Sequence, residues 1–307
     1  MNNTEYLKID KINEALKTDP EAVIMLDEQR FFERLIKLAD TVLQDKKNKI
    51  ILLSGPSGSG KTTSSQILKK IFESNGVDTA IISLDNFYKR PEDMPKLPSG
   101  EPDFESVHSI DTDEIHNDFI ELIQYGSCDI PVFDFLKGKR IEKAEHIQLR
   151  PGGLAIVEGI HALNPLISQT LPRENLFSVY ISIENGYESE SGEIKLHGRD
   201  LRLIRRLIRD YKYRNSSAEN TLRMWPGVIH GEEKYLFPNK NRADYTINSL
   251  HSYEAAVFKD EALQLLAGIG KSSEYYKYVK DIVEVLPLFV GISQDLVPSG
   301  SLLHEFI

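Results

Sequence analysis

A glycine-rich run followed by a lysine and two threonines is the strongest chemical signal in this 307-residue sequence. It comes directly after the apolar run Ile50 to Leu53, directly before residues that suit a helix, and it fits the pattern G-x-x-x-x-G-K-[ST]. In such a loop, backbone N–H groups surround phosphate oxygens and the helix N-terminus adds a partial positive charge. The run consists of Gly55, Pro56, Ser57, Gly58, Ser59, Gly60, Lys61, Thr62 and Thr63.

This P-loop pattern predicts a site for the phosphates of a nucleotide. Lys61 would reach the β- and γ-phosphates, and the hydroxyl of Thr62 would bind Mg²⁺. We therefore expect ATP and Mg²⁺ as cofactors. ATPases, GTPases and small-molecule kinases all share such a loop, so other residues must identify the reaction.

Two carboxylates follow apolar runs of strand length. Asp85 comes after Ala80 to Leu84 and is our candidate general base, which would orient an acceptor hydroxyl, take its proton and lie beside the metal ion. Glu158 ends the run Leu154 to Val157; a charge on a buried strand needs a partner, and Mg²⁺ is a natural one. A turn or helix-cap role for Asp85 and a structural salt bridge for Glu158 are the alternatives.

Arginines recur from Arg199 to Arg209 at spacings of three and four. At about 100° per residue they share one side of a helix, while leucine and isoleucine fill the other side. Like charges at this spacing destabilise a helix, so we expect an anion to compensate them, and a transferred phosphoryl group is our preferred anion. A face that contacts RNA, or a solvated face with ion-pair partners, are the alternatives.

Short apolar runs alternate with helical stretches over the middle of the chain, with further runs at Pro131 to Phe135 and Val179 to Ile183. This alternation predicts an α/β fold, with a mostly parallel sheet that is covered by helices on both faces and binds ligands at the carboxyl ends of its strands. The segment Asn86 to Glu105 contains four prolines and no period, which indicates a long surface loop.

The sequence suggests three parts. Residues 1–46 form a helical N-terminal appendage, with a break at Asp19-Pro20 because the residue before a proline resists the α conformation. Residues 47–250 form a kinase domain whose arginine-bearing lid covers about 197–225, and residues 251–307 form a helical C-terminal extension that packs on the core. A homo-oligomer supported by these terminal appendages is an open alternative.

Composition narrows the class of protein. Hydrophobic residues make up 40% of the chain, and no apolar run approaches the roughly 18 residues that span a bilayer. A net charge of −10 argues against a broad nucleic-acid surface. The first residues show no secretory signal, and the single cysteine, Cys128, agrees with a reducing compartment. We expect a cytoplasmic protein that binds a small molecule and neither nucleic acid nor membrane.

From about Ile50 to Ser249 the sequence resembles the uridine kinase and phosphoribulokinase family of P-loop kinases. The resemblance rests on motifs in the family's order: GPSGSGKTT, LDNFY, IPVFDF followed by Arg140, IVEGIHAL and RRLIRD. It implies the P-loop NTPase fold and transfer of the γ-phosphoryl group of ATP to the 5′-hydroxyl of a nucleoside.

The resemblance also implies roles for single residues. Asp85 matches the catalytic aspartate, Glu158 the magnesium-associated glutamate, and Arg206 and Arg209 the catalytic lid arginines, while Glu105 aligns with the ribose-binding aspartate. The residues expected to contact the acceptor are Tyr88, Phe104, Glu105, Phe133, Arg140 and Arg206.

Two positions depart from the family pattern. Phe133 replaces a tyrosine and Gly138 replaces a base-contacting histidine, so two polar contacts are missing and uridine itself is in doubt. A kinase for a sugar phosphate or a vitamin precursor is the first alternative. A P-loop nucleotide-binding regulator or an RNA-associated ATPase is the alternative from another class.

Overall fold

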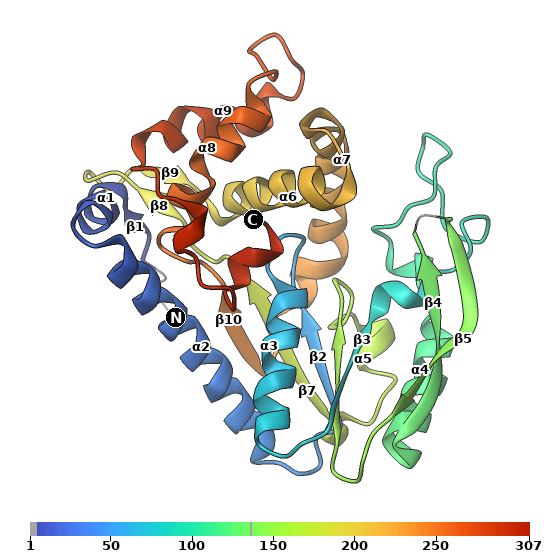
Figure 1. Cartoon of the computed structure of the whole chain (residues 1–307). Helices are drawn as coiled ribbons and strands as arrows, with labels where there is room; N and C mark the ends of the chain where they lie inside the picture. The colour runs from blue at the N-terminus through green and yellow to red at the C-terminus, as the bar shows by residue number, and fades with distance from the viewer. Residues whose placement is uncertain (1–4, 136) are drawn as a thin grey trace.

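A five-stranded parallel sheet lies at the centre of the computed structural model, which describes residues 5–135 and 137–307 (Figure 1). The strand order is β10-β7-β2-β6-β3, and each neighbouring pair is parallel. The bounds are β2 (Ile50–Ser54), β3 (Thr79–Ser83), β6 (Leu154–Glu158), β7 (Leu176–Ser182) and β10 (Tyr245–Asn248). The predicted α/β fold with a parallel sheet is therefore confirmed.

Side chains alternate between the two faces of the sheet along each strand, and both faces are buried. In β2, Ile51 and Leu53 point into one hydrophobic cluster, whereas Ile50 and Leu52 point into the other. Apolar residues therefore follow one another without a polar residue between them in runs such as IILL of β2, as in other parallel sheets that are covered on both sides.

Helices cover the two faces unequally. The hydrophobic cluster that contains Ile51 also contains buried residues of seven helices. These are α1 (Ile9–Thr18), α2 (Pro20–Leu43), α3 (Lys61–Ser74), α6 (Gly198–Arg214), α7 (Ala218–Gly231), α8 (Glu254–Leu266) and α9 (Tyr276–Val285). The face of Ile50 packs against α4 (Thr112–Tyr125) and α5 (Pro165–Ser168). Shorter helical turns are η1 (Leu84–Phe87), η2 (Val107–Ser109), η3 (Arg173–Asn175), η4 (Glu232–Leu236), η5 (Phe237–Arg242), η6 (Leu286–Leu288), η7 (Gln294–Leu296) and η8 (Leu302–Glu305).

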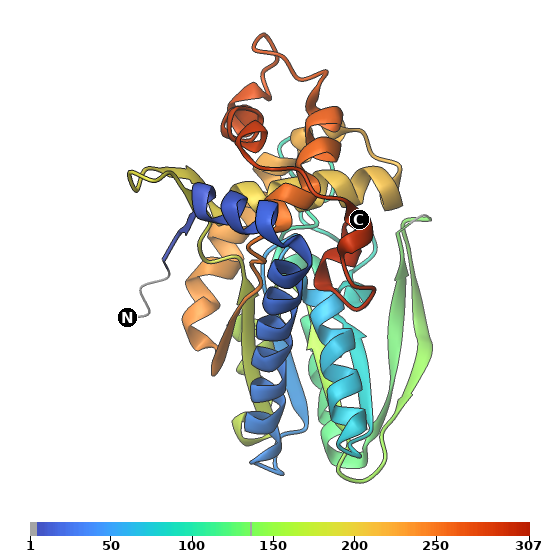
Figure 2. The ribbon, with the colours of Figure 1, turned by 60° about the vertical axis from the view of Figure 1, so that its left-hand side comes forward.

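The N-terminal helices break where the sequence predicts. Asp19 ends α1 and caps α2, since its side chain accepts a hydrogen bond from the Ala22 backbone N–H at 3.0 Å, and Pro20 occupies the first helical turn. Helix α2 then runs beside α3 (Figure 2). A short strand, β1 (Leu7–Lys8), precedes α1 and joins β8 (Tyr187–Glu188) and β9 (Ile194–Leu196), so this segment is not wholly helical.

The predicted strand Pro131 to Phe135 does not join the parallel sheet. It is part of β4 (Ser127–Asp134), which pairs antiparallel with β5 (Lys139–Gln148) in a hairpin that stands beside α4 (Figure 2). The register shifts between Ile130 and Val132, on either side of Pro131, because proline has no N–H to donate to the ladder.

The loop that begins at Asn86 is mainly turns and bends, with isolated bridges between Tyr88 and Ile110 and between Lys96 and Pro102. It passes along the carboxyl edge of the sheet toward α4. Within the described ranges, every helix is too short or too polar to cross a lipid bilayer.

Candidate active site

The P-loop connects β2 to α3, and its glycines meet steric requirements. Gly58 and Gly60 have φ angles of +75° and +85°, in the left-handed region that favours glycine. A Cβ on Gly55 would lie 2.1 Å from the carbonyl oxygen of Ile181, so a larger residue could not occupy that position. The loop therefore has the tight curvature with which backbone N–H groups surround a phosphate.

Lys61 begins α3 and folds over the loop. Its ammonium group donates to the carbonyl oxygens of Gly55 at 2.8 Å and Pro56 at 3.2 Å. Burial lowers the pKa of Lys61, while nearby carboxylates, Glu158 first, act in the opposite direction. The lysine thus belongs to a cluster of charged groups that extends beyond the loop.

A cavity of about 600 Å³ opens beside the P-loop. It brings together predicted site residues from five separated parts of the sequence, as the family resemblance implies. The predicted site residues that line it are Ser57, Gly58, Gly60, Lys61, Thr62, Asp85, Tyr88, Phe104, Glu105, Glu158, Arg206 and Arg209.

Asp85 and Glu158 reach this cavity from neighbouring strands. Ser83, two residues before Asp85, is opposite Glu158 in the pairing of β3 with β6. The Asp85 side chain is open to the cavity yet surrounded by protein, and this enclosure raises its pKa, while Lys61 opposes the rise. Glu158 is buried; burial raises its pKa first, Lys61 lowers it, and repulsion by Asp85 raises it further.

This donor set suits a magnesium ion. Mg²⁺ prefers carboxylate and hydroxyl oxygens and completes its shell with water and substrate phosphates. Thr62, Asp85 and Glu158 all line one cavity, and repulsion by Asp85 raises the pKa of Glu158, an effect that a nearby cation would oppose. The chemistry of these side chains therefore fits the expected metal.

Aromatic side chains form one wall of the cavity. The ring centroid of Tyr88 lies 5.3 Å from that of Phe104, 5.6 Å from that of Phe133 and 5.8 Å from that of Phe135, all edge to face. Tyr88, Phe104 and Phe135 line the cavity, whereas Phe133 is only 4% exposed and lies behind Tyr88. Phe133 thus supports the wall rather than forming its surface.

Glu105 lies between this wall and the arginine-bearing helix. Burial raises its pKa to about 7, and the guanidinium of Arg206 acts in the opposite direction. Its backbone N–H donates to Asp103 Oδ1 at 3.1 Å, and a Cβ on Gly231 would lie 2.6 Å from the Glu105 Cβ. These contacts position the backbone and Cβ of Glu105, whose side chain lines the cavity.

The structure does not bring Arg140 to the cavity. Its guanidinium, 5% exposed, pairs with Glu114 on α4 and with Glu142 at 2.9 Å. It also donates to the carbonyl oxygens of Phe87 and Tyr88, both at 3.2 Å. Arg140 therefore fixes the backbone that carries Tyr88 and does not itself reach the acceptor side.

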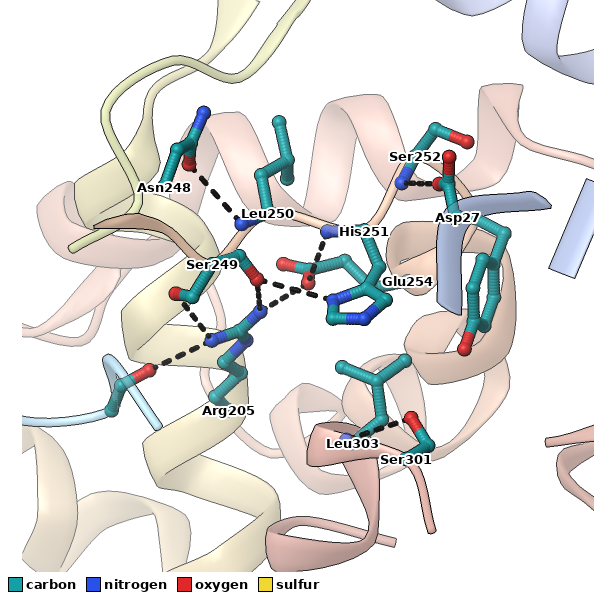
Figure 3. A network of polar contacts seen from close by, with 12 residues as sticks. Asp27, Arg205, Asn248, Ser249, Leu250, His251, Ser252, Glu254, Ser301 and Leu303 are labelled. Carbon is teal, nitrogen blue, oxygen red and sulfur yellow. Dashed lines mark hydrogen bonds and ion pairs between the residues drawn. The ribbon is translucent and has the colours of Figure 1, made fainter. Parts of the chain in front are cut away.

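Arg202 and Arg205 of α6 donate hydrogen bonds to backbone carbonyl oxygens of the P-loop. Arg202 donates to Glu232 at 2.7 and 2.8 Å and to the Ser57 carbonyl oxygen at 2.9 Å. Arg205 is fully buried; it pairs with Glu254 and donates to the carbonyl oxygen of Gly58 at 3.2 Å (Figure 3). These contacts join the loop to the lid helix.

Arg206 and Arg209 of α6 face the cavity around a buried carboxylate. Arg206 lies 3.2 Å and Arg209 3.0 Å from oxygens of Asp210, which is 1% exposed, and Arg206 also donates to Ser57 Oγ at 2.9 Å. Carboxylates of this chain pair with these arginines, and binding of a transferred phosphoryl group by Arg206 and Arg209 stays a prediction. Burial of the helix also removes the support for an RNA-binding face.

Sequence reasoning missed Glu232, Asp210 and Glu305. Glu305 comes from the C-terminal end of the chain and lines the same cavity. The arginine pattern predicts that anions are needed, but it does not identify them. Glu232 and Glu305 are distant in sequence from the groups that they bind, so no local pattern reveals them.

Comparisons with known proteins agree with this geometry. Residues 50–186 match the model described as "Phosphoribulokinase / Uridine kinase family". A uridine kinase of Chlamydia pneumoniae is 28% identical over 65% of this chain and 81% of its own length. A uridine kinase of Saccharomyces cerevisiae is 28% identical over 83% of this chain and 46% of its own length.

A solved structure described as a possible uridine kinase from Bacillus stearothermophilus covers 70% of this chain and 97% of its own, with 16% identity and a TM-score of 0.46. A TM-score below 0.5 is too low for a conclusion about the acceptor. The family model matches the segment that carries the P-loop, Asp85 and Glu158. Residues 50–186 of this chain are therefore similar to the phosphoribulokinase and uridine kinase family of P-loop kinases.

Proposed function

We propose that this chain transfers the γ-phosphoryl group of ATP, with Mg²⁺, to the 5′-hydroxyl of a nucleoside. One observation carries the proposal: a single cavity is lined by P-loop residues, by the carboxylates Asp85 and Glu105, and by the aromatic side chains Tyr88, Phe104 and Phe135. The P-loop residues suit a nucleotide donor. The carboxylates and aromatic side chains suit a hydroxylated acceptor with a flat ring.

On the donor side, residues 55–63 would bind the phosphates through backbone N–H groups and Lys61. Thr62, Asp85 and Glu158 would hold Mg²⁺, which neutralises phosphate charge when it is bound. Arg206 and Arg209 line the cavity, where they would stabilise the negative charge that develops during transfer.

On the acceptor side, Asp85 would orient the attacking hydroxyl and accept its proton. Enclosure raises the pKa of Asp85, which makes it a stronger base than an ordinary aspartate. Glu105 would accept hydrogen bonds from the vicinal hydroxyls of a ribose.

The aromatic side chains that line the cavity favour a nucleoside over a sugar phosphate as the acceptor. Tyr88, Phe104 and Phe135 offer faces and edges on which a base can stack. The curated relatives named above are uridine kinases. The identity of the base is left to experiment.

The test is ADP formation from ATP and Mg²⁺ in the presence of ribonucleosides, deoxyribonucleosides, sugars and sugar phosphates, with the product identified by ³¹P NMR. A phosphate monoester on the 5′ carbon of a nucleoside is expected. Turnover of sugar phosphates alone would overturn the nucleoside assignment in favour of the first alternative. Bound ATP without turnover of any acceptor would overturn the assignment as a kinase of these compounds.

A further inference from the structure

The C-terminal residues 301–307, here called the C-terminal latch, lie against the start of the P-loop helix α3. Leu302 packs directly on Gly60, since a Cβ at that glycine would lie 2.4 Å from Leu302 Cδ1. Leu302 is itself fully buried. The latch therefore touches the loop at the point where its backbone turns into the helix.

Glu305, within this latch, binds the first turn of α3. Its Oε2 accepts hydrogen bonds from the backbone N–H of Thr63 at 3.3 Å and from the Thr63 hydroxyl at 2.9 Å. Its Oε1 lies 4.0 Å from a guanidinium nitrogen of Arg209. An internal carboxylate thus occupies two donors and approaches one cation of the cavity.

These donors are of the kind that a P-loop offers to phosphate. The first N–H groups of a helix have no intrahelical partner, and in a P-loop they point at phosphate oxygens together with the positive end of the helix dipole. Thr63 is the third residue of α3, directly after Lys61 and Thr62, so its backbone N–H belongs to this set. A carboxylate and a phosphate oxygen cannot both accept from them.

We infer that Glu305 is an internal competitor for the phosphates of the donor nucleotide, and that the C-terminal latch must release Thr63 before ATP binds fully. The inference rests on the proposed use of ATP. Because Glu305 and the nucleotide are both anionic, they repel each other in the cavity as well as competing for Thr63. Closure of the latch lowers the apparent affinity for the nucleotide by the fraction of molecules that are closed.

The latch has further contacts, and release of Thr63 by Glu305 loosens the latch without breaking all of them. Leu302, Leu303 and Phe306 are buried in the large hydrophobic cluster, whereas the Glu305 side chain is 15% exposed. The Tyr213 hydroxyl on α6 donates to the Ile307 carbonyl oxygen at 2.6 Å. The latch is thus joined to the same helix as Arg209, so a movement of α6 would also shift Glu305.

The test is the dissociation constant for ATP·Mg²⁺, measured by titration calorimetry without acceptor, for wild type, Glu305→Gln and Asp295→Asn. Asp295 is a matched control: it lies in the same extension and loses the same charge, but its carboxylate accepts from the nearby Ser293 hydroxyl at 3.1 Å. Glu305→Gln should bind ATP about fivefold or more tightly, and Asp295→Asn should match wild type.

Unchanged or weaker binding by Glu305→Gln would overturn the competitor role, and weaker binding would make Glu305 a donor-binding group. Failure of all three proteins to bind ATP would instead overturn the assignment of the donor site, and the latch with it. Hydrogen exchange gives an independent readout. A non-hydrolysable ATP analogue should accelerate exchange in residues 302–307 of the wild type, and slower exchange there would contradict the inference.

Discussion

The carboxylate of Glu232 lies directly behind the P-loop and accepts two hydrogen bonds from Arg202, at 2.7 and 2.8 Å. It accepts a third from the backbone N–H of Ser57 at 3.1 Å. Glu232 is fully buried and Arg202 is 3% exposed. A two-pronged ion pair therefore fixes the conformation of the loop that would bind phosphate.

Replacement of Glu232 by glutamine should destabilise the protein strongly. The change leaves Arg202 buried without its counter-charge, which costs about 3–5 kcal/mol of unfolding free energy. Urea denaturation followed by circular dichroism measures it. The neighbour Glu233, which pairs with Arg199 at 3.3 Å on the surface, is the control, and Glu233→Gln should cost about 1 kcal/mol or less. Equal costs for the two variants would show that the buried pair has no special role.

Phe104→Ala should weaken acceptor binding more than donor binding. Phe104 lines the cavity and contacts Tyr88 edge to face, so its loss removes part of the surface on which a base would stack. The KM for a nucleoside should rise by roughly tenfold while the KM for ATP changes little, as steady-state kinetics would show. The surface residue Tyr125, 74% exposed on α4, supplies a control in Tyr125→Ala. A larger effect on ATP than on the nucleoside would count against the aromatic wall as the acceptor site.

Glu105 should make stability depend on pH. Its pKa is about 7 in the folded protein against 4.5 for an ordinary glutamate, so the folded state binds more protons between these values. This contribution to stability is fully present below pH 4.5 and is lost as the pH rises through 7.

Glu105→Gln should therefore stabilise the protein at pH 8 relative to wild type by about 2 kcal/mol, with a smaller difference at pH 5. Urea denaturation at both pH values measures this. Glu101→Gln, an exposed change in the same loop, should show no such pH dependence. If Glu105→Gln has the same unfolding free energy as wild type at both pH values, the pKa of Glu105 is not raised in the folded protein.

The central sheet and the donor site could be predicted because their signals are local. A glycine-rich run after an apolar strand requires a tight turn before a helix, and Asp85 and Glu158 follow their strands directly, so the carboxyl edge of a parallel sheet brings them together. The break at Asp19-Pro20 is equally local, since one residue caps the next helix.

Other features depend on contacts between distant residues and give no local signal. Strand β5 is mostly exposed and rich in charge, which hides its pairing with β4 and led to the wrong placement of Pro131 to Phe135. Arg140 looked like a ligand contact because its position in the sequence does not reveal the pairing with Glu114 on α4. Glu305 is 242 residues away from the threonine that it binds.

The most direct test of the kinase assignment is Asp85→Asn, compared with Asp93→Asn, an exposed aspartate in the loop that follows Asp85. Turnover of the best nucleoside and the dissociation constant for ATP·Mg²⁺ should be measured for both variants and wild type. If Asp85 is the general base, Asp85→Asn lowers kcat by roughly 10²- to 10⁴-fold, leaves the ATP dissociation constant within about threefold of wild type, and Asp93→Asn behaves as wild type. Turnover by Asp85→Asn at the wild-type rate would contradict the central claim.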